Sequence, residues 1–197
     1  MSLGCRLWPN CFAWCGISIA CWTDVFCKTW SCSNRYSTLN GVWWSKDVTK
    51  YRKKMICNSM VKSVLIYGAE TWSLYEDGRR RINTSEMDAL RRSARISKLG
   101  RKTNEYIRGK MDAQGTLVDE ITRKQLIWYG HVERMDPTGL PKIMINWKPE
   151  GRKKWGRPRR TCIDGIYTAV SERDVRMGEW NNRGQWSMGV GRRRQKF

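Results

Sequence analysis

The chain has 197 residues, and its 38 lysine and arginine residues outnumber 18 aspartate and glutamate residues, for a formal net charge of +20. This length excludes a large two-domain enzyme and allows one ordinary domain, or a small domain with tails. The excess of positive charge points to a polyanionic partner, either nucleic acid or an acidic membrane surface.

The first 45 residues differ in composition from the rest of the chain. They carry a net charge of +2, whereas residues 46–197 hold 35 basic and 17 acidic residues. Six of the eight cysteines lie within the first 32 residues, and six of the twelve tryptophans lie within the first 44. We therefore treat residues 1–45 as a separate segment.

Three interpretations of residues 1–45 compete. A secretory signal followed by a disulfide framework would use residues 11–20 as its apolar run, but Pro9 and Asn10 interrupt the sequence directly before that run. A zinc site would need Cys-x-x-Cys pairs, which are absent here, and a membrane span would need a longer apolar run than Asp24 allows. We favour the third interpretation, an arbitrary sequence such as a shifted or intronic reading frame, because the apolar residues of this segment follow neither a helical nor a strand period. The segment is then expected to be disordered.

Amphipathic helices are expected between residues 46 and 148. The first covers residues 51–67, with Ile56, Met60 and Val64 on one stripe and Gly68 beyond its end. A second opens with the capping pattern of residues 83–86 and stops near Gly100.

Two further helices follow in this body. Residues 116–135 begin with a Thr116 and Asp119 cap pair and end before Pro137. The expected apolar face of this helix comprises Leu117, Ile121, Trp128, Val132 and Met135. The next helix covers residues 140–147, and its expected apolar face comprises Leu140, Ile143, Met144 and Trp147.

Residues 149–160 are expected to form an extended basic loop, because glycine and proline forbid a regular helix there. The tripeptide Gly156-Arg157-Pro158 matches the core of hooks that enter a narrow A·T minor groove, although a solvated charged linker explains it equally well. Residues 161–197 are expected to hold a short helix around Ile163 to Val170 and a basic tail. The loop cations are Arg152, Lys153, Lys154, Arg157, Arg159 and Arg160.

Catalytic and cofactor motifs are missing from the sequence. His131 is the single histidine and is expected to be packed or solvent-facing, without a ligand partner. No Walker A loop, dinucleotide fingerprint or Asp-Asp pair occurs. We therefore expect no catalytic residue, no metal site, no cofactor and no small-molecule substrate.

Several strings taken in order carry a family resemblance. They are residues 64–72 (VLIYGAETW), 86–92 (EMDALRR), 120–135 (EITRKQLIWYGHVERM), 147–151 (WKPEG), 156–158 (GRP) and 182–186 (NRGQW). Residues 128–134 (WYGHVER) are the most specific part of these strings. The order and spacing of the strings resemble the C-terminal part of endonuclease–reverse transcriptases of non-LTR retrotransposons, over roughly residues 50–197.

The resemblance implies a small, mainly α module that looks like the polymerase thumb and its connection, which grip the template–primer duplex. The family's catalytic Tyr-x-Asp-Asp motif has no counterpart here, and its endonuclease domain is absent, so no catalytic residue carries over. Cys162 stands where the family tends to have tryptophan. Backbone contacts are expected from a helical basic face of Arg91, Arg92, Arg95, Lys98, Arg101 and Lys102, and from the loop cations.

These observations predict a truncated reverse-transcriptase remnant that is not an enzyme on its own and that binds RNA or DNA non-specifically. Such a protein would be nuclear or cytoplasmic if expressed and would not use a membrane. The alternative is a secreted cysteine-rich interaction protein with a basic C-terminal half, in which the N-terminal cysteines would be paired.

Overall fold

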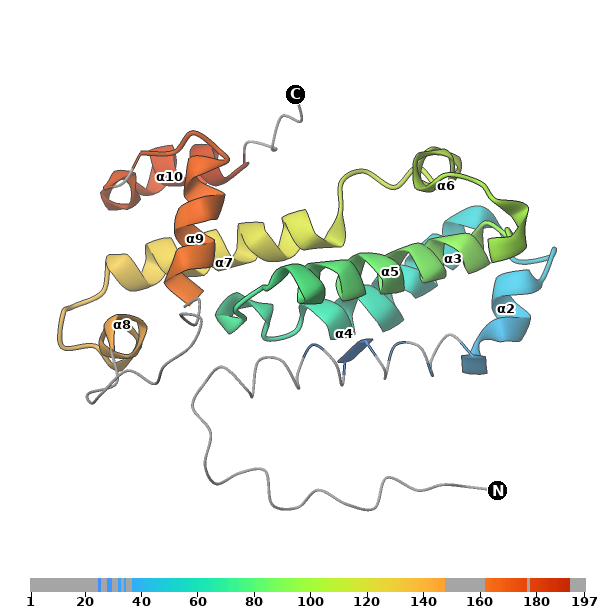
Figure 1. Ribbon diagram of the computed structural model, residues 1–197, viewed down its shortest axis with the longest axis horizontal. Coiled ribbons are helices and arrows are strands. Elements are labelled where there is room, and N and C mark those ends of the chain that lie inside the picture. The colour runs from blue at the N-terminus through green and yellow to red at the C-terminus, as the bar shows by residue number, and fades with distance from the viewer. Residues whose placement is uncertain are drawn as a thin grey trace, which may run out of the picture.

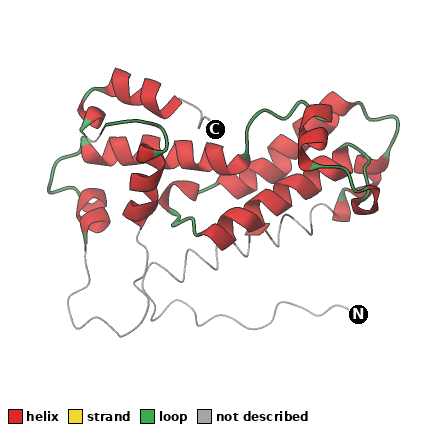
Figure 2. Cartoon of the chain, turned by 45° about the horizontal axis from the view of Figure 1, so that its top comes forward, coloured by secondary structure: helices red, strands yellow, loops and turns green. Residues whose placement is uncertain are grey.

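The structure is a computed structural model, and it describes Val25, Lys28, Thr29, Cys32, Asn34 and residues 37–147, 162–176 and 178–191. Regular structure in these residues is helical throughout (Figure 2), which confirms the predicted mainly α fold. The α-helices are α2 (Asn40–Trp44), α3 (Lys50–Cys57), α4 (Ser63–Ile66), α5 (Glu76–Ser93), α6 (Asn104–Lys110), α7 (Leu117–Glu133), α8 (Leu140–Asn146), α9 (Cys162–Ser171) and α10 (Arg183–Gly191).

The helix predicted for residues 51–67 is present with an irregular centre. The Thr49 side chain caps α3 by accepting from the Arg52 N–H, 3.4 Å away. A π-helical segment, Asn58–Lys62, joins α3 to α4. Gly68 adopts a φ of +64° just after the helix, a left-handed conformation that glycine reaches without strain, so the predicted stop is confirmed.

The predicted bounds of the second helix are wrong at both ends. Helix α5 begins at Glu76 rather than at Asn83, and it ends at Ser93 rather than near Gly100. The Thr84 hydroxyl donates to the Arg80 carbonyl, 2.8 Å away, so the polar residues that resemble a cap are accommodated inside the helix. Burial of Gly78 and Ile82 holds the N-terminal half of α5 against the core.

Helix α7 has the predicted capping box, because Thr116 and Asp119 each accept from the other's backbone N–H. Its apolar face is broader than predicted. Trp128 and Met135 are only half-buried, whereas Leu126 and Tyr129 are buried. The helix buries two sides because different elements cover its two halves (Figure 1).

The first core cluster joins the N-terminal half of α7 to α4, α5 and the described residues before α2. Leu65, Ile82 and Ile121 are fully buried at its centre. The side chain of Gln125 donates to the carbonyl oxygens of Ala69, 2.9 Å away, and Trp72, 2.8 Å away. These bonds give hydrogen-bond partners to two backbone carbonyls in the turn that follows α4.

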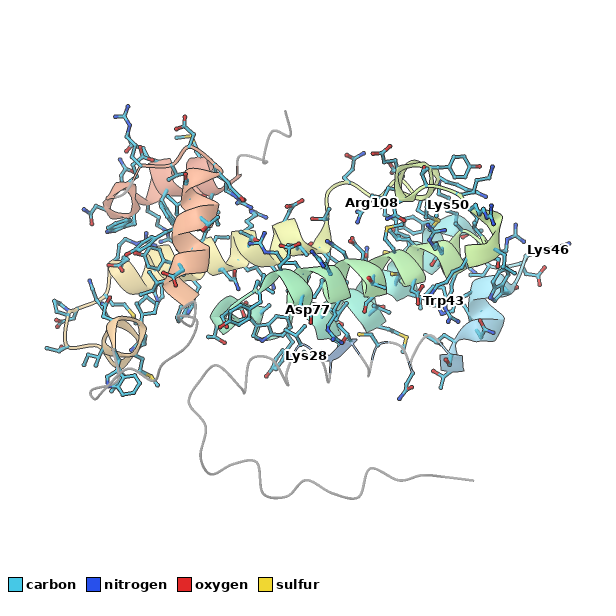
Figure 3. All side chains as sticks on the ribbon, viewed as in Figure 1. Lys28, Trp43, Lys46, Lys50, Asp77 and Arg108 are labelled. Atoms are coloured by element: carbon cyan, nitrogen blue, oxygen red, sulfur yellow. The ribbon has the colours of Figure 1, made fainter. Side chains whose placement is uncertain are left out.

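The prediction that residues 1–45 are disordered is wrong for the described residues in the second half of that segment. Val25 and Cys32 belong to the first cluster, and Trp43 is fully buried on α2, beside α5 (Figure 3). Buried Lys53 donates to the carbonyl oxygens of Trp43 and Ser45, each 2.7 Å away. A core that uses these side chains cannot begin at residue 46.

The second core cluster lies around the C-terminal half of α7, where α9 and α10 pack (Figure 1). Helix α9 confirms the predicted short helix, but α10 was not predicted. The Trp186 ring of α10 covers Gly130 of α7, and Trp186 Nε1 donates to the Leu126 carbonyl, 3.1 Å away.

Helix α8 confirms the helix predicted for residues 140–147, with Pro141 in its first turn. The four residues expected to form its apolar face are nevertheless exposed. Leu140 is 73% exposed, and Ile143, Met144 and Trp147 are at least 48% exposed.

A third cluster packs α6 against the C-terminal half of α5. Ile107 and Met111 are buried against Met87, Leu90 and Ala94. An ion pair between Arg108 Nη2 and Glu86 Oε2, 2.7 Å long, adds a polar link between the two helices.

Candidate nucleic-acid interface

A basic groove lies between α5 and the chain that connects it to α6. Its volume is about 450 Å³. It contains four of the six cations predicted for this region and a single carboxylate, that of Asp88. The lining residues are Asn83, Thr84, Met87, Asp88, Arg91, Lys98, Arg101, Lys102 and Asn104.

Left-handed backbone positions bring the groove cations together. After α5 ends, Arg95 adopts a φ of +56° and reverses the chain, and Arg101 adopts a φ of +45° before α6. Between them, Ser97 caps a short 3₁₀ helix, Lys98–Gly100. The prediction of one continuous helical basic face is therefore wrong, because the cations are gathered by a folded loop against α5.

Two groove cations have structural partners. Arg91 Nη2 donates to the Lys102 carbonyl and to Asn104 Oδ1, each 2.9 Å away, so it fixes the loop to α5. Lys98 Nζ pairs with Asp88 Oδ1 at 2.9 Å, although the Lys98 side chain remains 74% exposed. Arg91 and Lys98 therefore stabilise the loop that forms the groove, and their charged groups already have partners within the protein.

Arg101 and Lys102 supply charge that is open to solvent. Both residues are exposed, and no carboxylate of the described residues lies within ion-pair distance of either. Lys102 Nζ lies 5.5 Å from the centroid of the Tyr106 ring, close enough for a cation–π interaction.

Arg92 and Arg95 were predicted as part of the same face but do not line the groove. Arg92 Nη1 donates to Asn40 Oδ1 of α2, 3.3 Å away. Burial lowers the pKa of Lys53, and the positive charge of Arg95 lowers it further, which places the Arg95 charge near Lys53. Arg92 thus links α5 to α2, whereas Arg95 lies outside the groove lining.

The six loop cations predicted as a second binding element lie outside the described residues. They are Arg152, Lys153, Lys154, Arg157, Arg159 and Arg160. Their contribution stays a prediction.

A second groove, which the sequence did not suggest, has a volume of about 300 Å³ and is lined by α3, the π-helical segment, α5 and residues 111–117. Its charges are paired, since Lys62 contacts Glu120 and Lys54 lies 3.7 Å from Asp112. Desolvation by burial, with a smaller contribution from Glu86, raises the pKa of the Cys57 thiol at its edge to about 11. Such a thiol is a poor nucleophile, because little thiolate forms near neutral pH.

The described residues contain no group of three histidine, cysteine, aspartate or glutamate side chains that could hold a metal ion. His131, which the sequence left as either packed or solvent-facing, is exposed on α7. Among the helices that the structure describes, none is both long and apolar enough to cross a membrane.

Comparison with known proteins gives one distant similarity. The chain is 23% identical over 122 residues to a Caenorhabditis elegans protein described as an uncharacterized transposon-derived protein. The match covers 60% of this chain but only 44% of the relative's length. No protein-family model matches the chain, and no solved structure matches it.

Proposed function

We propose that this chain is a transposon-derived protein, a remnant of a non-LTR retrotransposon reverse transcriptase whose helical module binds nucleic-acid backbones. The similarity to a transposon-derived protein supports the origin. The ordered strings, from residues 64–72 to residues 182–186, support the reverse-transcriptase parent. Such a remnant would act in the nucleus or the cytoplasm.

The basic groove is the observation that carries the binding proposal. Phosphate contacts come from arginine and lysine side chains held at fixed positions, and they carry no sequence information. Arg101 and Lys102 meet this requirement, because α5 and the capped loop position them and solvent reaches them. Binding through these side chains would be sequence-independent and would weaken as salt rises.

Matched charge variants test this proposal. Arg101→Gln with Lys102→Gln removes two groove charges, whereas Arg176→Gln with Arg183→Gln removes two exposed charges near α9 and α10. The groove variant should flatten the dependence of log K on log salt for duplex DNA by roughly 1.8, since each phosphate contact contributes about 0.9. The control should keep the wild-type slope, and equal slopes in all three proteins would refute a binding role for the groove.

We also propose that the chain has no polymerase activity on its own. Two-metal phosphoryl transfer needs clustered carboxylates, and the sequence has no Asp-Asp pair. Primer extension on a primed RNA template with Mg²⁺ and deoxynucleotides should match a buffer blank. Extension that survives repurification would overturn this expectation.

The alternative, a secreted cysteine-rich interaction protein, requires paired N-terminal cysteines. Cys32 is fully buried among apolar side chains, and its Sγ lies 3.9 Å from the Val61 carbonyl oxygen. This position favours a packing role for Cys32. Thiol titration of the denatured, unreduced protein separates the two proposals, since six paired N-terminal cysteines would support the secreted protein.

A further inference from the structure

Exposed apolar side chains lie beside the cations of the basic groove. Leu99 is 91% exposed in the 3₁₀ helix that carries Lys98, and Tyr106 is 51% exposed in the first turn of α6. Lys102 belongs to the groove lining and also approaches the Tyr106 ring. The basic surface thus continues directly onto an aromatic face.

Contact with phosphates alone does not need an aromatic face. A duplex presents its phosphates outward and keeps its bases stacked inside, so exposed tyrosine and leucine side chains gain little from it. A single strand has unstacked bases, and proteins that bind it combine a positively charged groove with aromatic side chains on which bases stack. The combination of Arg101, Lys102 and Tyr106 fits the second case.

We propose that the basic groove binds a single-stranded segment of nucleic acid, with phosphates on Arg101 and Lys102 and a base stacked on Tyr106. This inference rests on the proposed nucleic-acid binding and narrows it to single strands. The groove volume of about 450 Å³ lies in the range of about 300–1,000 Å³ that accommodates small ligands, so a nucleotide unit fits. Lys102 would remain near the Tyr106 ring, so its ammonium group would interact with a phosphate and with the ring at the same time.

The test uses the full chain and three probes: short oligouridylate, short oligothymidylate, and an RNA duplex of the same length. Tyr106→Ala should weaken binding of both single strands by about tenfold, because stacking of one base is lost, and it should leave duplex binding unchanged. Tyr106→Phe should bind like wild type, since the ring remains. Tyr51→Ala, which removes a 71% exposed tyrosine of α3, is the matched control and should change nothing.

Other results of this experiment would overturn the stacking proposal alone or the binding proposal as well. A Tyr106→Leu variant with native helical circular dichroism and wild-type affinity for single strands would overturn the stacking proposal. Equal losses on single strands and on the duplex would also overturn it, while binding through Arg101 and Lys102 would stand. Absence of binding to all three probes by the wild-type chain would overturn both proposals, as would equally tight binding of polyglutamate.

Discussion

The indole ring of Trp186 occupies the space that a side chain at residue 130 would need, and Gly130 leaves that space open. A Cβ atom at Gly130 would lie 2.7 Å from Trp186 Cδ1 and 2.8 Å from Cε2. These residues belong to two strings of the family resemblance, residues 128–134 and 182–186. The two strings are therefore in contact in the second core cluster, which gives their joint presence a physical reason.

Gly130→Ala should destabilise the protein by about 2–3 kcal/mol, because the added methyl group overpacks a buried site and displaces Trp186. The hydrogen bond from Trp186 Nε1 to the Leu126 carbonyl should be lost with it. Chemical denaturation measures the change. Gly165→Ala is the control, since nothing lies within 4 Å of a Cβ there, and it should stabilise α9 by about 0.5–1 kcal/mol. Equal stability of the two variants would contradict the proposed packing.

A chain that begins at Lys46 should lose its cooperative thermal transition. It lacks Val25, Cys32 and Trp43, and loss of a buried tryptophan side chain alone costs about 3–5 kcal/mol, a large part of the stability of a small domain. Lys53 would also lose both of its carbonyl acceptors. A chain that begins at Asp24 keeps these residues and should melt like the full chain. Similar melting of both truncations would show that the segment is dispensable, as its composition suggested.

Stability should fall between about pH 9 and pH 11 because of Cys57. The thiol pKa is raised from 9.0 to about 11 in the folded chain, so the proton is retained there while the unfolded chain loses it. The stabilisation is complete below pH 9 and is lost as pH rises to the folded pKa, by at most about 2–3 kcal/mol at 1.36 kcal/mol per unit. Other groups titrate in this range, so the difference between wild type and Cys57→Ser isolates the effect. A constant difference across the range would contradict it.

The loop of residues 149–160 should contribute to nucleic-acid affinity independently of the basic groove. If about four of its cations meet phosphates, the six-fold glutamine variant of Arg152, Lys153, Lys154, Arg157, Arg159 and Arg160 should flatten the salt dependence on duplex DNA by roughly 3–4. Arg157→Lys should weaken binding to A·T tracts more than to G·C duplexes if the loop enters a narrow groove. An unchanged slope in the six-fold variant would place the charge contacts outside this loop.

The sequence predicted the starts of two helices correctly from local signals. Thr116 and Asp119 define the start of α7, and Pro141 defines the start of α8, through capping and backbone geometry within one turn. Helix α10 was missed although Asn182 caps its first turn, accepting from the backbone N–H groups of Gly184, 3.1 Å away, and Gln185, 3.2 Å away. It contains Gly189, which lets Val175 approach to 2.9 Å from the Cβ position, so its stability depends on packing between distant residues.

The candidate site was predicted in composition but not in shape. The cations of residues 91–102 were identified from charge, yet their grouping depends on the left-handed conformations of Arg95 and Arg101, which arginine rarely adopts. The sequence therefore favoured a straight helix. Tyr106 was not identified as a site residue because its exposure depends on how α6 packs, with the neighbouring Ile107 buried against α5. The signal that could have indicated Tyr106 is an aromatic residue directly beside an apolar residue in a short helix that follows a run of cations.

Helix α7 contributes side chains to both the first and the second core cluster. Ile121 lies in the first core cluster and Tyr129 lies in the second, with Gln125 bound to the turn after α4 between them. An amide near the middle of α7 is released only by an opening that disturbs both clusters, so we expect its protons to be among the slowest to exchange. We therefore expect the parts of the chain on either side of α7 to unfold together.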